Sequence, residues 1–358
     1  MSICRLTEKF MSTKIKSFVS PKNLAAFARC SLLTVIFGLF FIVNAAAQNQ
    51  ADSVVLVISK NDRTISFIDP AQIKEIARIP IPGGPHELAV SADNRFAYLA
   101  NYYQADEKLG HSISVIDIAA RKEIKKIETG ALEMLHGIVE SGGNLYFTSE
   151  QTRTVARLNT ATGSVDWIRG TGQSLTHIPI VSPDGKRLYV TNMNSDSVTM
   201  IDIEGSGQDA AAIKQIAVGG KPEGIAVSPD GKELWVGQNG DGNISIIDAQ
   251  TLAVKKIFKA GRMPIRLKFT ADGKRVVVVD PRTSEVIVYE AVTAREIKRI
   301  SVEGGPVSFA FSPDERRIAV SLLNIAKAAI VDLESGNVLG TVPVGNVPDG
   351  IIWTKTRK

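Results

Sequence analysis

The sequence predicts an all-β protein, a seven-bladed β-propeller with four strands in each blade, on three observations. An acidic or amide residue that closes a β-rich run recurs seven times, at intervals of 42 to 48 residues. Each interval holds four short runs separated by turn residues, which is the pattern of one propeller blade. Apolar residues alternate or form short blocks, and no long 3.6-residue period favours helices.

The stretch from Val218 to Asp248 shows the repeating unit in order. A first apolar run, Gly224 to Ser228, leads into a Ser-Pro-Asp-Gly turn, a second run that ends at Gln238 and a third that ends at Asp248. Proline presets φ at the first corner of the turn, Asp accepts hydrogen bonds from its own backbone, and Gly takes the left-handed position. The seven residues that close the third runs are Asp69, Asp117, Asn159, Asp202, Asp248, Glu290 and Asp332.

The two ends of the repeat region supply complementary parts of one blade. Residues 54–59, 64–69 and 74–80 match second, third and fourth strands, whereas residues 348–353 match a first strand alone. Pairing of that strand with the other three closes a ring of seven blades and hides two sheet edges. An open β-solenoid is the alternative, but it would need capping repeats at its ends. We therefore expect the propeller over residues 54–354 and a short tail over residues 355–358.

Residues 1–47 are expected to be a signal peptide. Basic residues precede an apolar run from Leu32 to Val43, and three alanines ending at Ala47 follow as a signal-peptidase site. The alternative is a membrane anchor, but the run is shorter than the roughly 20 residues that span a bilayer. Residues 48–53 would then be a short linker, and the mature protein is expected in the periplasm or outside the cell.

The leader accounts for the excess positive charge of the sequence and for both of its cysteines. It holds six Lys and Arg against one acidic residue, so the remaining 311 residues carry 36 charges of each sign. Nucleic acid is therefore not an expected partner, and a membrane is one only through an uncleaved leader. Both cysteines, Cys4 and Cys30, lie in the leader, so the propeller is expected to lack disulfides, thiolate metal sites and covalent c-type haem.

Residues 182–192, SPDGKRLYVTN, give the most regular form of the turn and second strand. They resemble the consensus of the bacterial YVTN-type β-propeller repeat, and the resemblance covers about residues 54–354. It implies the propeller fold, export and a binding or surface role. Related propellers include haem d1-binding domains, proteins associated with quinone-cofactor metabolism, lactonases and a metal-dependent lyase. The corners at residues 131–135 and 176–179 depart from the consensus, and such departures are where a function is expected.

One position of the repeat collects polar side chains around the ring. The residue before the usual glycine of the corner is, blade by blade, His86, His136, His177, Glu223, Ile265, Val307 and Asp349. Because the first strand of a propeller blade is innermost, these residues should surround one mouth of the central channel. The three histidines and Asp349 are candidate ligands of a divalent transition metal, since imidazoles with carboxylates suit such ions. Glu223 is the candidate catalytic acid or base.

Loops between second and third strands should open on the same face. The longest is expected over residues 101–111, and it supplies Tyr102 and the fourth histidine, His111, as ligand-binding candidates. The same topology places five arginines on this face, Arg63, Arg153, Arg262, Arg266 and Arg282, of which Arg153, Arg262 and Arg266 are ligand-binding candidates. All four histidines are then expected at one mouth. The alternative is structural: duplication copied one corner histidine into neighbouring blades, where each bonds a backbone carbonyl.

Several functions remain open at this stage. The first is a binding module that holds a small molecule, a metal ion or a periplasmic protein partner at the mouth. The second is a metal-dependent lyase or hydrolase, similar to a lactonase, that uses the same residues and keeps one metal position open. A third is a tetrapyrrole site of the haem d1 kind, with one histidine as axial ligand and arginines for the carboxylates. The P-loop, GxGxxG, HExxH and GxSxG motifs are absent from the sequence.

Overall fold

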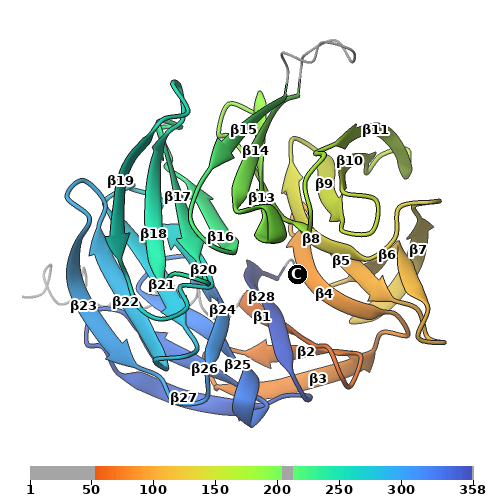
Figure 1. Ribbon diagram of the computed structural model, residues 1–358. Helices are drawn as coiled ribbons and strands as arrows, with labels where there is room; N and C mark the ends of the chain where they lie inside the picture. The colour runs from red at the N-terminus through yellow and green to blue at the C-terminus, as the bar shows by residue number, and fades with distance from the viewer. Residues whose placement is uncertain (1–52, 204–212, 357–358) are drawn as a thin grey trace, which may run out of the picture. The chain divides into compact units, whose positions relative to one another are not determined.

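A computed structural model describes residues 53–203 and 213–356 of the protein. These residues form seven antiparallel four-stranded sheets, the blades, arranged in a ring (Figure 1). The predicted seven-bladed propeller is therefore confirmed. The predicted signal peptide lies outside the described residues. Within the described ranges, no helix is long and apolar enough to cross a membrane.

Three blades carry the histidines of the predicted mouth. Blade 1 consists of β4 (Gly84–Val90), β5 (Phe96–Tyr103), β6 (Leu109–Asp117) and β7 (Lys122–Glu128). Blade 2 consists of β8 (Leu135–Ser141), β9 (Asn144–Ser149), β10 (Thr154–Asn159) and β11 (Ser164–Gly170). Blade 3 consists of β12 (Thr176–Val181), β13 (Arg187–Asn192), β14 (Ser197–Asp202) and β15 (Ile213–Ala217), with the 3-10 helix η1 (Met193–Ser195) after β13.

Four further blades complete the ring. Blade 4 consists of β16 (Pro222–Val227), β17 (Glu233–Gln238), β18 (Asn243–Asp248) and β19 (Val254–Lys259). Blade 5 consists of β20 (Arg266–Phe269), β21 (Arg275–Asp280), β22 (Glu285–Glu290) and β23 (Arg295–Ser301). Blade 6 consists of β24 (Pro306–Phe311), β25 (Arg317–Leu322), β26 (Lys327–Asp332) and β27 (Val338–Pro343), with the 3-10 helix η3 (Leu323–Ile325). Blade 7 consists of β28 (Pro348–Lys355), β1 (Ser53–Ser59), β2 (Thr64–Asp69) and β3 (Lys74–Pro80).

Blade 7 joins the two ends of the described chain. Strand β28 pairs antiparallel with β1, so that Trp353 lies opposite Val55. The Trp353 indole is 7% exposed, and its Nε1 donates a hydrogen bond to Ser53 Oγ at 3.0 Å. The predicted closure by one C-terminal and three N-terminal strands is confirmed.

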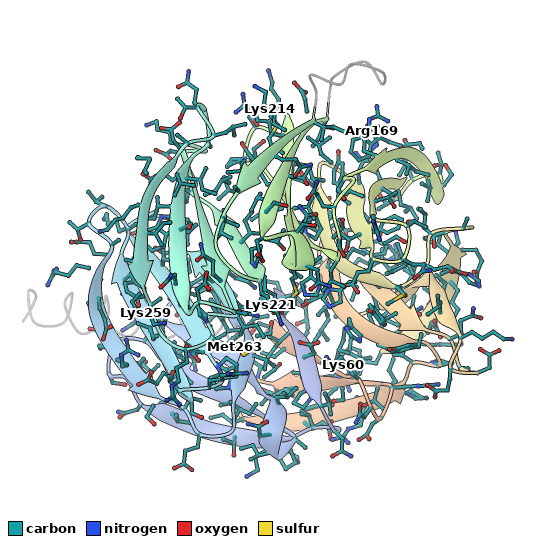
Figure 2. The ribbon with its side chains drawn as sticks, viewed as in Figure 1. Lys60, Arg169, Lys214, Lys221, Lys259 and Met263 are labelled. Carbon is teal, nitrogen blue, oxygen red and sulfur yellow. The ribbon has the colours of Figure 1, made fainter. Side chains whose placement is uncertain are left out.

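The first strand of every blade is the innermost. Inner strands of neighbouring blades contact one another, as β4 contacts β8 and β8 contacts β12. Figure 2 shows Lys221, which precedes an inner strand, near the centre of the ring, whereas Arg169 and Lys214 of outer strands lie at the periphery. This radial order brings the corners before the inner strands to one end of the channel.

Apolar side chains between blades form the core, because each sheet buries both faces against its neighbours. Leu56 and Phe67 of blade 7 pack with Leu99 of blade 1 in one fully buried cluster. The indole of Trp235 in blade 4 contacts the ring of Phe269 in blade 5, with centroids 5.8 Å apart. The apolar residues that alternate along the sequence thus pack between neighbouring blades.

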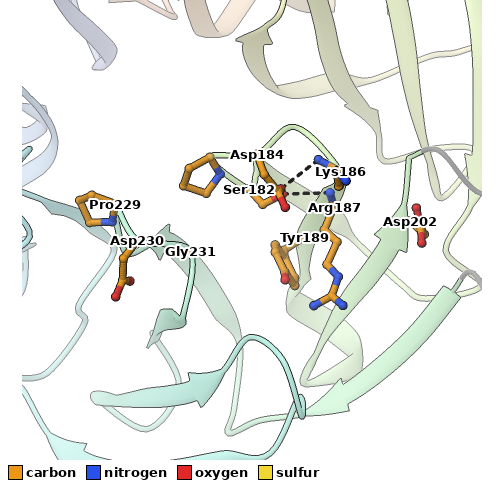
Figure 3. A pocket seen from close by; sticks show the side chains of 10 residues that line it. Ser182, Asp184, Lys186, Arg187, Tyr189, Asp202, Pro229, Asp230 and Gly231 are labelled. Carbon is orange, nitrogen blue, oxygen red and sulfur yellow. Dashed lines mark hydrogen bonds between the residues drawn. The ribbon is translucent and has the colours of Figure 1, made fainter.

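Turns between first and second strands show the predicted Ser-x-Asp chemistry. In blade 3, Ser182 Oγ donates to Asp184 Oδ1 at 2.6 Å, and the backbone N–H groups of Lys186 and Arg187 donate to Asp184 and Ser182 (Figure 3). Gly185 closes the turn at a φ of 74°, in the left-handed region. These bonds hold the turn on the face of the ring away from the histidines.

One loop is shorter than expected. The loop predicted over residues 101–111 spans only residues 104–108, because β5 continues to Tyr103 and β6 begins at Leu109, and these two residues pair; it is still the longest connection between a second and a third strand. The residual loop is held against blade 7 by Arg63, whose Nη1 donates to the carbonyl oxygen of Ala105 at 3.0 Å and which pairs with Glu107. Extra backbone pairing therefore replaces part of the open loop.

Candidate metal-binding site

Local backbone geometry aims the corner side chains at the mouth. In blades 1 to 4, the register between first and second strands shifts next to His86, His136, His177 and Glu223. Such bulges redirect side chains that a regular strand would turn into the sheet. The residue two positions earlier has a positive φ in three of these blades, at Met134, Leu175 and Lys221. The same corner geometry in each of these blades thus points the corner side chain in the same direction, toward the mouth.

Three imidazoles and one phenol form a column at the mouth. The ring of Tyr102 stacks on His86 with centroids 4.4 Å apart, and His86 meets His136 edge to face at 5.0 Å. His136 in turn stacks on His177 at 3.8 Å. His136 and His177 are 6% and 7% exposed. The structure therefore brings together the three histidines that the sequence placed at equivalent positions.

Glu150, which sequence reasoning missed, completes a possible metal site. It follows β9 directly, is 7% exposed, and lies with Oε1 2.6 Å from His177 Nδ1. Tyr102 donates its hydroxyl hydrogen to Glu150 Oε2 at 2.6 Å. One ligand atom from each of His136, Glu150 and His177 lies within 4.8 Å of the other two. Two imidazoles and a carboxylate are a usual donor set for Zn²⁺ and similar ions.

A second repeat position would have revealed Glu150. The equivalent residues, which follow the second strand directly in six blades and lie near its end in blade 1, are Lys60, Tyr102, Glu150, Met193, Asn239, Pro281 and Leu323. Three members of this set contact the corner residue of their own blade, and one of them is Tyr102, which stacks on His86. Lys60 Nζ lies 2.9 Å from Asp349 Oδ2, and Asn239 donates to Glu223. Glu150 instead bonds His177, which is the corner residue of the next blade.

The histidines differ in charge. Burial acts to lower the pKa of His177, but its contacts with Glu150 and Glu223 outweigh burial and raise the pKa to about 9. Burial and the charge of Lys60 lower the pKa of His86 to about 3. Burial also holds the pKa of His136 well below its usual value. His86 and His136 are therefore neutral near pH 7, which is the form that binds metals, whereas His177 is protonated and would have to release a proton on binding an ion.

Two nitrogen atoms of the column lack a partner. The Nδ1 atoms of His86 and His136 are buried, and neither atom has a hydrogen-bond partner within the described residues. Buried polar atoms are normally paired, so an unpaired one needs an explanation. The structural alternative, in which each corner histidine bonds a backbone carbonyl, does not account for these two atoms.

Arg266 holds two carboxylates beneath the column. Its Nη1 donates to Glu223 Oε1 at 2.7 Å and its Nη2 to Glu87 Oε1 at 2.5 Å. Burial acts to raise the pKa of Glu223, but Arg266 and His177 outweigh it and lower the pKa to about 2. A general acid or base works best with a pKa near the working pH. The geometry therefore favours a fixed negative charge at Glu223, and its catalytic role stays a prediction.

The remaining candidate residues lie outside the column. The carboxylate of Asp349 is paired with Lys60, and burial is outweighed by that cation, so its pKa lies below the usual value. His111 does not join the other histidines, because its Nδ1 contacts Glu128 Oε2 at 2.8 Å on the neighbouring strand β7. Arg153 and Arg262 are exposed. The expectation that all four histidines converge is therefore not met.

A cavity of about 530 Å³ lies on the opposite face, between the turns of blades 3 and 4 (Figure 3). Its lining includes Asp184, Arg187, Tyr189 and Asp230. No candidate residue of the mouth lines it, so it is separate from the histidine column.

Fold and site together define a propeller of seven blades with a buried histidine–carboxylate cluster at one channel mouth. Comparison of its sequence with family models gives a match over residues 143–351. The chain belongs to the cytochrome D1 heme domain family. None of the curated proteins matches the sequence.

Solved structures agree on the fold. A functionally unknown protein from Desulfotomaculum acetoxidans superposes with a TM-score of 0.71 at 14% identity, over 85% of this chain and 99% of that one. Pseudomonas aeruginosa periplasmic gluconolactonase superposes with a TM-score of 0.70 at 19% identity, over 85% of this chain and 99% of that one. Kuenenia stuttgartiensis hydrazine synthase superposes with a TM-score of 0.61 at 18% identity, over 76% of this chain and 89% of that one. At these identities the similarity concerns the fold alone.

The residues at the mouth fit a metal ion better than the haem in the family's description. Tyr102, His86, His136 and His177 are packed ring against ring, which leaves no slot for a macrocycle among them. Arg266, a buried arginine whose partner Glu223 contacts His177, already binds two carboxylates. A tetrapyrrole therefore does not fit among these residues, whereas the ligand atoms of His136, Glu150 and His177 lie close enough to one another to share a single ion.

Proposed function

We propose that the protein binds a divalent transition-metal ion at the channel mouth through His136, Glu150 and His177. The observation that carries the proposal is the convergence of these three buried side chains, with their ligand atoms within 4.8 Å of one another. The unpaired Nδ1 of His136 supports it, because a metal ion would occupy a lone pair that no described residue uses.

The surrounding residues suit the support of such an ion. Metal ligands are usually oriented by outer hydrogen bonds, and Tyr102 donates one to Glu150. Glu223 lies 3.5 Å from Nε2 of His177 and adds negative charge. Three protein ligands would leave one position of a tetrahedral site for water or a small ligand. The leader sequence favours a place for this protein in the periplasm or outside the cell.

A second candidate function is that of a metal-dependent lyase or hydrolase. The number of candidate protein ligands favours it, since an ion held by only three of them could also bind water and lower its pKa, or polarise a carbonyl group. It requires the same three ligands. The binding function is the broader proposal, because it needs no acid or base with a pKa near neutrality.

Metal analysis of the full chain, purified without a histidine tag, tests the proposal. We expect about one transition-metal ion per chain, since one structural or catalytic site takes one ion. The variants His136→Ala and Glu150→Gln should lose the ion while keeping the circular dichroism spectrum of the wild type. His111→Ala is the matched control, because His111 lies outside the column, and it should retain the ion.

Two results would overturn the metal proposal. One is metal well below one ion per chain in the wild type, with no change in thermal unfolding after chelation. The other is equal metal content in the wild type and His136→Ala. An absorption spectrum of the same sample with the bands of a tetrapyrrole would instead favour the cofactor of the family's description.

A further inference from the structure

The central channel contains a second cavity, separate from the histidine column. It has a volume of about 520 Å³, within the range of small-molecule sites, and inner strands of all seven blades line it. Most of the wall is apolar, and its side chains include Leu88, Ile138, Ile180, Ile225 and Ile352. The cavity is therefore large enough, and its wall apolar enough, to hold a molecule with an apolar body.

The two ends of this cavity differ. Toward the mouth it is bounded by Glu87 and Arg266, which bind each other. Toward the opposite face its lining includes Pro229, Ala271 and Glu315, from turns that join first and second strands. A ligand would therefore enter from the face away from the histidines, and it would stop at the Arg266 ion pairs.

One cation in the channel has no ion-pair partner. The Nζ of Lys268 donates one hydrogen bond, to the carbonyl oxygen of Phe309 at 2.8 Å, and lies 5.4 Å from the centre of the Phe309 ring. It forms no ion pair with a carboxylate in the part of the chain that the structure describes. An ammonium group has three donors, so two remain available. Burial lowers the pKa of Lys268 to about 8, which still leaves it mostly charged at neutral pH.

Glu87 does not neutralise this lysine. Its charge acts on Lys268, but its carboxylate is already bound to Arg266. Lys268 is half-buried, so its charge has lost part of its contact with water and no counter-ion compensates for that loss. The channel thus combines an unpaired cation with apolar walls.

We propose that the channel binds a small organic anion with one carboxylate and an apolar body. The carboxylate would accept hydrogen bonds from Lys268, and the hydrocarbon part would pack against the wall of Leu88, Ile138, Ile180, Ile225 and Ile352. A single ammonium matches a monoanion better than a phosphate dianion, which needs more donors. The site does not depend on a metal ion at the mouth.

A purely structural role for Lys268 is the competing explanation. Threonine hydroxyls bridge other blades in a similar way, because Thr148 Oγ1 donates to the carbonyl of His177 at 2.7 Å and Thr191 Oγ1 to that of Glu223 at 3.0 Å. A bridge needs a donor and no charge. Lys268→Gln separates the two roles, because glutamine keeps an N–H donor and removes the charge.

Calorimetric titration of the full chain with octanoate tests the proposal. The wild type should bind one octanoate saturably, with the same affinity before and after chelation of metals. Octanamide, which has the same body without the charge, and the Lys268→Gln variant should each weaken binding at least about tenfold, as expected for loss of a charged hydrogen bond.

Three results would overturn the proposal. They are the absence of saturable octanoate binding, equal affinities for octanoate and octanamide, and equal octanoate affinities of wild type and Lys268→Gln. If Lys268→Gln does not fold, the comparison of octanoate with octanamide on the wild type decides. Octanoate binding by a chain that holds no metal would uphold this site while the metal proposal fails.

Discussion

Arg266 is the residue on which the interior of the mouth depends. It is 8% exposed, and it binds Glu87 of blade 1 and Glu223 of blade 4 across the channel. Removal of one partner from a buried ion pair leaves an uncompensated charge, which costs far more than the net value of the pair. The three side chains therefore act as one unit.

Arg266→Met should lower the free energy of unfolding by about 3 kcal/mol or more, because it leaves two buried carboxylates without their cation. The combined variant Glu87→Gln, Glu223→Gln, Arg266→Met should lose less than Arg266→Met alone. Urea unfolding measures both. Arg153→Met is the control, since Arg153 is exposed and its substitution should change stability by less than about 0.5 kcal/mol. A triple variant with a lower free energy of unfolding than Arg266→Met would show that the three charges are not coupled.

At this scale, sequence reasoning found some partners and missed others. His86, His136 and His177 were predictable, because one repeat position marks them. Glu150 belongs to a second repeat position, which becomes meaningful once the register of first and second strands is known. The Arg266–Glu87 contact joins residues 179 positions apart across the channel, and no periodicity in the sequence signals it.

The turn between first and second strands is the element that recurs most faithfully. In blade 4, Ser228 Oγ donates to Asp230 Oδ1 at 2.7 Å, and the backbone N–H of Lys232 donates to the same oxygen at 3.1 Å. These bonds lower the pKa of Asp230 to about 2. A lowered pKa means that the ionised carboxylate stabilises the folded state above its ordinary pKa of 3.8, and that this contribution is lost as the pH falls toward 2.

Asp230→Ala should destabilise the protein at pH 7 by at most about 1 kcal/mol, because the carboxylate is exposed and screened by solvent. The difference between wild type and variant should shrink between pH 4 and pH 2. Urea unfolding at several pH values measures it, with Asp230→Asn as the control that keeps an acceptor oxygen without the charge. A difference that stays constant with pH would contradict the role given to the ionised carboxylate.

Strand assignments were the most predictable feature of the elements, because each turn and each Asp-closed run marks a boundary. The strands expected at 64–69 and 74–80 are β2 and β3 with the same bounds. The extension of β5 and β6 was not predictable, because Tyr103 and Leu109 read equally well as loop or strand. Cross-strand pairing decided between the two.

The whole ring creates the candidate site. His86, His136 and His177 come from three blades, and they meet because every blade directs its corner to the same end of the channel. Closure of the ring followed from the complementary chain ends. The contacts within the column could not be predicted in the same way, because the stacking of the rings depends on distances between blades, and the spacing of repeats in the sequence does not give those distances.

The most direct test is an anomalous-scattering difference map from crystals of the full chain grown with zinc, collected on both sides of the zinc edge. We predict one strong peak bounded by His136, Glu150 and His177, at about 2.0–2.2 Å from a nitrogen or oxygen of each. A map with no peak there, or with peaks only elsewhere, such as at His111 and Glu128, would contradict the assignment of the mouth as a metal site.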